Sequence, residues 1–527
     1  MVSSTALPRH RSPGAWRHAL AAVLALVVAL VVTGSGLSPV GAAVSTVQVV
    51  VQEWNPADNV AESAVERLGG DAGPQLPIVD GFAATIPATR LASLQAAPGV
   101  RNVTVNRSVT LSGRYGEDSG VASAVYTDAV RASAAWGKGY TGEGIGVALI
   151  DTGVNATGDL AGKVLHAEDF TQEQNNVDTF GHGTFVAGLI AGQGTASAGG
   201  VQGVAPGAHL VSVKIAGADG STDLFRLLAA LEWVATFKDV YGIRVLNLSL
   251  GSESTQSYLS DPLNLAVERV WNSGITVVVA AGNRGSASGT ILKPADDPLV
   301  ITVGAADDRT TTATKDDGIA PFSSNGPTAD GVAKPDVVAS GKSVVSTRAG
   351  GSTIDTAHPE ARIGDSYFKG SGTSFSAPIV AGAAALVIDR TWSLSPDQVK
   401  HRLVSTARPL SGAATTAQGA GEIDALAATM SSDTTAANAG RSGVSTAPPS
   451  AFNPVRLLGS SWAGSSWAGS SWAGSSWAGS QWNGSSWAGS SWAGSSWAGS
   501  SWAGSSWAGS TWAYEPSVLR WATSDWS

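Results

Sequence analysis

The sequence predicts an α/β fold with a mainly parallel central sheet and helices on both faces. Between about residues 120 and 430 it contains near-continuous apolar runs of strand length, at 144–153, 208–217, 243–251, 275–283 and 299–307. Helical patterns lie between these runs, for example at 223–237 and 262–274. Runs that are apolar on both faces are typical of strands covered by helices on either side of a parallel sheet.

The bulk composition limits the class of protein. With 527 residues the chain is long enough for two or three domains. Its 41 acidic and 32 basic residues give a formal charge of −9, and no run of Lys or Arg occurs. This pattern argues against nucleic acid as a partner. The sequence contains no cysteine, so an exported form must be stabilised by a large core or bound ions rather than by disulfides.

Residues 1–43 show the features of a secretory signal peptide in the usual order. Three arginines precede an uninterrupted apolar run at 19–32, and small residues follow it, with cleavage expected after Ala42 or Ala43. A retained membrane anchor is the alternative, because the run approaches the length that spans a bilayer. The leader predicts a secreted, extracellular protein.

Residues 47–110 form a small unit with the order β-α-β-β-α-β. Helical patterns occur at 57–70 and 88–97, and strand patterns lie before, between and after them. Asp80 and Gly81 form a turn between two apolar runs, which is a hairpin signal. The unit is long enough for a small α+β domain.

Polar side chains follow three of the strands predicted for the central sheet. These residues are Asp151, Ser249 and Asn283. In parallel sheets the active residues lie outside the carboxyl ends of the strands. A single aspartate at a strand end is more often a turn-former, so the other motifs must decide its role.

Two glycine-rich motifs place a histidine and a serine at helix starts. His182 lies between glycines in "FGHGTFVAGLIAG", where the helix dipole disfavours protonation and keeps the ring available as a base. Ser374 lies in the first turn of "SGTSFSAPIVAG", where backbone N–H groups face any negative charge that develops. A structural histidine and an N-capping serine are the alternatives.

The blocks "VALIDTGV", "GHGTFVAG", "VAAGN" and "GTSFSAP" resemble, in this order, the four signature blocks of the subtilisin-like serine peptidases, the subtilases. Blocks such as "GVAPGAHLVSVKI" and "LNLSLG" match as well. The resemblance extends from about residue 120 to 430. It implies a subtilisin-like three-layer fold and hydrolysis of peptide bonds through an acyl-enzyme.

The resemblance also implies the roles of the catalytic residues. Ser374 is the expected nucleophile, His182 the general base, and Asp151 the residue that orients and supports the imidazolium. The side chain of Asn283 and the backbone N–H of Ser374 form the expected oxyanion hole. No cofactor is required for this chemistry.

Substrate is expected to bind as an extended strand, as in the family that the blocks resemble. Two backbone edges match 217–222 and 248–251, and a pocket wall matches 280–282 together with Leu292. The expected substrate-binding residues are Gly217, Gly220, Ser249, Leu250, Gly251, Ala281 and Gly282. Arg284 stands where a well-known member has an acid, and it either favours acidic substrates or is a solvated surface residue.

The chain departs from the family pattern at two residues and in one loop. Phe185 stands where many members have a second histidine, and Phe375 stands where methionine is usual. Asp159 matches a calcium ligand of several relatives, but the partner loop at 192–201 lacks the carboxylates and amides that a tight site needs. Calcium is therefore not supported by the loop sequence, and no metal site is predicted.

The small unit matches the strand and helix order of a subtilase propeptide. We therefore assign 44–118 to an inhibitor-like propeptide and 119–430 to the peptidase domain, with processing expected between Ser112 and Val121. The prediction is a secreted serine endopeptidase made as an autoprocessed zymogen. Its partners are protein or peptide substrates and, as an intramolecular inhibitor, its own propeptide.

The C-terminal region is not explained by the family. Residues 431–458 read as a linker, and 459–527 repeat "SSWAG" with a tryptophan every five residues. Neither a helix nor a strand keeps that period on one face. Four interpretations of the tail stay open: a solenoid, a stalk that binds a cell surface or glycan, a self-association segment, or a flexible linker. The alternative function is a surface-binding or adhesive protein that acts through this tail and has a vestigial peptidase domain.

Overall fold

The computed structural model describes residues 45–111, 113–115 and 124–439. The predicted signal peptide, most of the predicted linker and the SSWAG tail lie outside the described residues. Within these ranges, no helix has both the length and the apolar character needed to cross a membrane.

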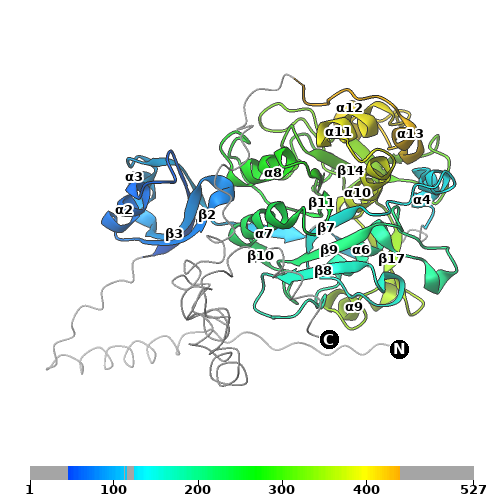
Figure 1. Cartoon of the computed structure of the whole chain (residues 1–527), viewed down its shortest axis with the longest axis horizontal. Helices are drawn as coiled ribbons and strands as arrows, with labels where there is room; N and C mark the ends of the chain where they lie inside the picture. The colour runs from blue at the N-terminus through cyan, green and yellow to red at the C-terminus, as the bar shows by residue number, and fades with distance from the viewer. Residues whose placement is uncertain (1–44, 112, 116–123, 440–527) are drawn as a thin grey trace, which may run out of the picture. The chain divides into compact units, whose positions relative to one another are not determined.

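The predicted peptidase region is built on an eight-stranded sheet in the order β15-β14-β13-β11-β7-β9-β8, with β16 beside β14 (Figure 1). The pairings are parallel except that β15 runs antiparallel to β14. The strands are β7 (Gly146–Asp151), β8 (Val164–Asp169), β9 (His209–Lys214), β11 (Ile243–Leu248), β13 (Thr276–Ala280), β14 (Ile301–Asp307), β15 (Gly318–Ile319) and β16 (Val337–Ser340). These pairings confirm the prediction of a mainly parallel sheet. Strands β7 and β13 are buried along their whole length, as predicted for strands covered on both faces.

Two groups of helices pack against this sheet. Helix α10 (Thr373–Arg390) packs on α6 (His182–Ala191) and on β11, β13 and β14. Helices α7 (Leu224–Phe237) and α8 (Pro262–Asn272) pack on each other and contact β7 and β13 respectively. The other helices are α4 (Tyr126–Ala129), α5 (Ala132–Trp136), α9 (Thr353–Ala357), α11 (Pro396–Ser405), α12 (Thr415–Gln418) and α13 (Ala425–Met430).

The N-terminal domain is a small antiparallel sheet in the order β2-β3-β1-β4 with two helices. Its elements are β1 (Thr46–Glu53), α2 (Val60–Arg67), β2 (Asp71–Leu76), β3 (Gly81–Pro87), α3 (Leu91–Gln95) and β4 (Val100–Val105). The β-α-β-β-α-β order is therefore confirmed. Asp80 adopts the left-handed conformation, with φ of 50°, at the turn that leads into β3.

The sheet of the N-terminal domain is buried on both faces, because alternate residues of β1 join different cores. Val49 and Val51 pack with Phe82 and Leu94 in the domain's own core. Val50, between them, belongs to the large core of the peptidase region. This alternation is the period of two that a strand between two packed layers requires.

Two short sheets bring the segment that follows the N-terminal domain into the peptidase region. Strand β5 (Ser108–Leu111) lies between β10 (Thr222–Asp223) and β12 (Leu250–Gly251), antiparallel to both. The other sheet has the order β17-β19-β18, formed by β17 (Val344–Thr347), β19 (Tyr367–Ser371) and β18 (Arg362–Ile363). Strand β6 (Arg114–Tyr115) pairs antiparallel with β19.

The first residues of the predicted linker pack on the peptidase region. The backbone N–H of Ala437 donates to the carbonyl oxygen of Asp397 at 3.1 Å, and Asn438 Nδ2 donates to Asp397 Oδ1 at 2.7 Å. Packing against α11 (Pro396–Ser405) therefore continues beyond α13, to Asn438.

Candidate active site

Asp151 and His182 meet at the carboxyl end of β7. His182 Nδ1 lies 2.7 Å from Asp151 Oδ1 and 2.9 Å from Oδ2, and both side chains are buried. Since ionised carboxylate oxygens only accept, Nδ1 carries the proton and Nε2 is left as the acceptor. Within the described residues Nε2 has no hydrogen-bond partner. The pair is thus arranged as a base oriented by a carboxylate.

Glycines allow α6 to begin directly against the turn after Asp151. A Cβ on Gly183 would stand 2.2 Å from the carbonyl oxygen of Gly153. Gly181 adopts φ of 109°, a conformation that side chains rarely adopt. The "GHG" spacing therefore lets the imidazole approach the strand end closely.

Asp178 holds this junction together and was missed in the sequence analysis. Its carboxylate accepts from Thr152 Oγ1 at 2.7 Å and from the backbone N–H groups of Gly181 at 2.6 Å and Thr184 at 2.7 Å. Burial raises the pKa of Asp178, although these hydrogen bonds oppose the shift. The local signal was an acid just ahead of a helix start, a pattern typical of a capping residue.

Ser374 lies in the first turn of α10 and is fully buried. Its Oγ donates to the carbonyl oxygen of Ser249 at 3.1 Å, and Ser249 Oγ donates to the carbonyl oxygen of Ser374 at 2.7 Å. The hydroxyl is therefore bonded to the backbone after β11 rather than to His182. A change of the χ1 rotamer of Ser374 is what would turn Oγ away from Ser249.

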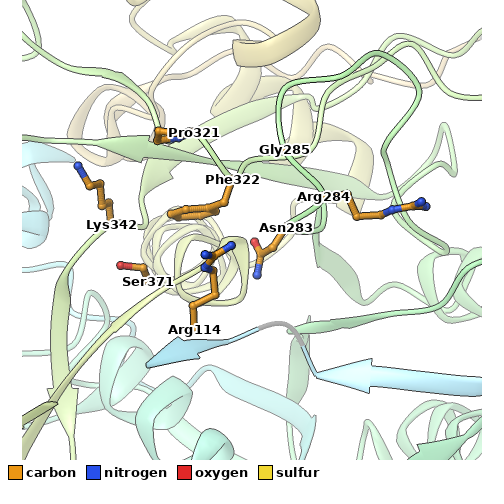
Figure 2. Close-up of a pocket in the computed structure, with 8 residues that line it drawn as sticks. All are labelled: Arg114, Asn283, Arg284, Gly285, Pro321, Phe322, Lys342 and Ser371. Atoms are coloured by element: carbon orange, nitrogen blue, oxygen red, sulfur yellow. The ribbon is translucent and has the colours of Figure 1, made fainter. Parts of the chain in front are cut away.

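Asn283 follows β13 and is oriented by the residue before Ser374. Asn283 Oδ1 accepts from the backbone N–H of Thr373 at 2.9 Å and from Thr373 Oγ1 at 3.0 Å. With its oxygen engaged by two donors, the amide presents its nitrogen as the donor end. Asn283 lines a cavity of about 440 Å³. Figure 2 shows Arg114 and Phe322 facing each other beside Asn283, and Arg284 extending away.

The expected substrate-binding edges hold a strand of the chain itself. Thr222 is opposite Val109, and Gly251 is opposite Thr110. This is the position that the sequence analysis assigns to substrate, between the edges at 217–222 and 248–251. Leu250, opposite Leu111, completes this pairing.

The other predicted substrate-binding residues support these edges or the pocket. A Cβ on Gly217 would meet Glu173, and one on Gly220 would meet the ring of Phe180, so both glycines shape the turn before β10. The side chain of Leu292 lies against both Gly251 and Gly282, within 2.9 Å of the Cβ that either glycine lacks. Ala281, which is buried, donates its N–H to Val303 and accepts from the N–H of Leu292. Leu292 and the 280–282 segment thus meet, as expected for a pocket wall.

The same segment continues past His182. A Cβ on Gly113 would stand 3.0 Å from His182 Cδ2, so residue 113 lies against the imidazole. Beyond it, Arg114 pairs with Ser371, and the Arg114 guanidinium carbon stands 5.7 Å from the centre of the Phe322 ring. Strand β5, Gly113 and strand β6 thus lie along the candidate site between β12 and β19.

Arg284 lies at the rim of the site. Its Nη1 is 3.6 Å from Glu253 Oε1, and both side chains are largely exposed, at 49% and 73%. An exposed pair of this kind contributes little to stability. The contact agrees with the interpretation of Arg284 as a solvated surface residue.

The surroundings of Asp159 do not fit a calcium site. Its carboxylate accepts from Thr195 Oγ1 at 2.5 Å, from the N–H of Ala196 at 2.9 Å and from Tyr367 Oη at 2.6 Å. These are donors, whereas calcium requires six to eight oxygen ligands. In the described ranges no three His, Cys, Asp or Glu residues gather in a metal-binding arrangement. The Asp159 carboxylate is thus satisfied by hydroxyl and amide donors.

We expect Asp159→Asn to lower the free energy of unfolding by about 1–3 kcal/mol at pH 7, because hydrogen bonds to a buried charge are lost. Burial would raise the pKa of Asp159, but the bonds from Thr195, Tyr367 and Ala196 outweigh it and lower the pKa. A lowered pKa stabilises the fold above the unfolded value of 3.8, so the difference from wild type shrinks as the pH falls below it. Thermal melts at several pH values measure this.

Asp239→Asn is the matched control, because that side chain is 87% exposed and should change stability by less than about 0.5 kcal/mol. Adding calcium or a chelator should move the melting temperatures of wild type and Asp159→Asn equally. Stabilisation by calcium of wild type alone would contradict the assignment.

Comparison with known proteins identifies the family. The profile described as "Subtilase family" matches residues 142–423, more than half of the chain. Serine protease AprX of Bacillus subtilis is 40% identical over 273 residues, which cover 51% of this chain and 62% of that protein. Subtilisin Savinase of Lederbergia lenta is 38% identical over 304 residues, which cover 57% of this chain and 96% of that protein.

An alkaline protease of Alkalihalobacillus alcalophilus is similar as well, at 38% identity over 304 residues that cover 57% of this chain and 68% of that protein. The match to the family profile ends with "GEI", directly before α13, and includes β7, α6, β13 and α10. The chain therefore belongs to the subtilase family, and residues 142–423 are a subtilisin-like serine endopeptidase domain.

Proposed function

We propose that the protein is a secreted serine endopeptidase that is made as a zymogen and cuts its own chain immediately before Gly113. Ser374 acts as the nucleophile, His182 as the general base and Asp151 as the residue that orients His182. The observation that carries the proposal is strand β5, which lies between the two substrate-binding edges, together with Gly113, which lies against His182.

The chemistry follows from these positions. Ser374 Oγ attacks the carbonyl carbon of the bond before Gly113, and His182 Nε2 accepts the hydroxyl proton. Asn283 Nδ2 and the N–H of Ser374 stabilise the oxyanion. The carbon–nitrogen bond then breaks, and His182 returns the proton to the amine of Gly113. Water, activated by the same imidazole, hydrolyses the acyl-enzyme and restores Ser374.

The bond before Gly113 is favoured because the general base must reach the leaving nitrogen. Residue 113 is the one whose Cβ position lies 3.0 Å from the imidazole carbon. This narrows the processing region expected at 112–121 to its first bond and would end the propeptide at residue 112 rather than 118.

Contacts of the N-terminal domain support its role as an intramolecular inhibitor. Arg107 Nη2 lies 2.9 Å from both carboxylate oxygens of Asp261, at the start of α8, and Arg107 Nε donates to Ser252 Oγ at 3.0 Å. Arg269 Nη1, on α8, donates to the carbonyl oxygen of Pro77 at 2.9 Å. These hydrogen bonds join the N-terminal domain, which processing would release, to the peptidase domain. They hold the segment in the cleft.

Secretion is proposed from the leader at 1–43, and the substrates are proposed to be proteins and peptides that bind as extended strands.

We expect residues 44–527, once expressed and purified, to release residues 44–112 and leave a new N-terminus at Gly113. The rate should not depend on protein concentration, because β5 and Gly113 already occupy the site of their own chain. Intact mass and N-terminal sequencing over time measure both. A first cut after residue 118, or a rate proportional to concentration, would contradict the assigned bond.

A further inference from the structure

An aromatic pocket lies beside the triad and holds Tyr115. The Tyr115 ring centre stands 6.1 Å from that of Phe185, 5.8 Å from Phe368 and 5.7 Å from Phe375, and the side chain is buried. Phe185 and Phe375 also contact each other, at 4.4 Å. The three phenylalanines come from α6, β19 and α10, so the pocket belongs to the peptidase domain and Tyr115 to the segment that crosses it.

Tyr115 folds back toward the residue at the proposed cut. A Cβ on Gly113 would stand 2.8 Å from Tyr115 Oη and 2.9 Å from Tyr115 Cε2. Such distances are too short for a real side chain at residue 113 while the ring occupies the pocket. While the aromatic ring of residue 115 occupies the pocket, there is therefore room only for glycine at position 113.

The ring, rather than the hydroxyl, makes the useful contacts. Tyr115 Oη is buried and has no hydrogen-bond partner among the described residues. Burial raises the pKa of Tyr115 well above its usual value, so the hydroxyl is neutral. Phenylalanine would fill the same space without burying an unbonded hydroxyl.

We propose that Phe185, Phe368 and Phe375 form a specificity pocket for the leaving side of substrates. It selects glycine directly after the scissile bond together with an aromatic residue two positions further on. Phe185 and Phe375 are the two residues by which this chain departs from the family pattern beside the triad. The inference rests on the proposed function, since the positions are counted from the bond before Gly113.

The test uses the processed enzyme and quenched fluorescent peptides with the sequence of residues 106–118. Tyr115→Phe in the peptide should leave kcat/KM within about twofold. Tyr115→Ala should lower it about 10- to 100-fold, the factor that burial of one large apolar side chain provides. Gly113→Ala should also lower it, but less when Tyr115 is already alanine, because the clash with the Tyr115 ring is then absent and only the 3.0 Å contact with His182 Cδ2 remains.

Variants of the enzyme test whether the phenylalanine pocket causes the difference between the tyrosine and alanine peptides. Phe368→Ala should bring the ratio of the rates for the tyrosine and alanine peptides close to one, since it removes a wall of the pocket. Phe322→Ala is the matched control, because it removes a phenylalanine that contacts Arg114 instead, and the ratio should persist. The peptide series with wild-type enzyme stands on its own if Phe368→Ala does not fold.

Digestion of casein distinguishes a failure of the pocket proposal from a failure of the proposed function. If casein is digested but the tyrosine and alanine peptides react equally, or no peptide is cut, the pocket assignment is overturned. If neither casein nor any peptide is cleaved, the proposed function fails first.

Discussion

Replacing Ser374 with alanine should leave residues 44–527 at full length and abolish hydrolysis of casein. The variant lacks the oxygen that forms the acyl-enzyme, so what remains is stabilisation by Asn283 and the bound strand. In subtilisin, a relative of this chain, loss of the corresponding serine costs about a millionfold in kcat. Wild-type and variant protein are followed side by side by intact mass spectrometry.

Ser376→Ala is the matched control for this prediction. Ser376 is also buried in α10, but its Oγ donates to the carbonyl oxygen of Ser340 at 3.2 Å. Removing it should leave self-processing in place. If wild type and Ser374→Ala both stay at full length, the catalytic interpretation loses its support, and the adhesive alternative based on the SSWAG tail becomes the stronger one.

The sequence predicts the strands of the central sheet because each is a buried run with a continuous apolar signal. Asp151 and His182 were predictable for a related reason, since each lies at a strand end or helix start marked by glycines. The Asp151–His182 contact at 2.7 Å joins residues 31 apart, and their shared edge of the sheet brings them together.

Long-range pairing of short segments was not predictable. Strands β5 and β6 have four and two residues, too few for any periodic pattern, yet both lie along the candidate site. Tyr367, whose hydroxyl donates to the Asp159 carboxylate, lies 208 residues away from it in the chain. Such contacts depend on how the folded surfaces meet, which local propensity does not encode.

The two hydrogen bonds between Ser249 and Ser374 were not predictable from the sequence either. Ser249 was expected to contact substrate, but its hydroxyl and carbonyl both bond to Ser374. Both residues are small and hydroxylated and lie 125 positions apart, so no motif joins them.

The second large effect is expected for Asp151→Asn, which should slow self-processing about ten-thousandfold while the chain stays folded. Both carboxylate oxygens now face His182 Nδ1, at 2.7 and 2.9 Å. An amide places an N–H group at one of these positions, so the ring is favoured in the tautomer with the proton on Nε2. That nitrogen then cannot accept the proton of Ser374, and a comparable tautomer change in trypsin-like enzymes costs about 10⁴ in kcat.

The first-order rate of loss of the full-length chain measures this directly, because the strand is already bound and substrate affinity does not enter. Asp178→Asn separates the chemical role from a structural one. That carboxylate accepts from Thr152 and from backbone N–H groups at the start of α6, and its bonds do not involve the His182 ring. Its loss should lower the melting temperature more than the rate, whereas Asp151→Asn should do the reverse. Equal losses of rate in the two variants would mean that Asp151 only holds the fold, since orienting the imidazole is the one role that distinguishes it from its buried neighbour.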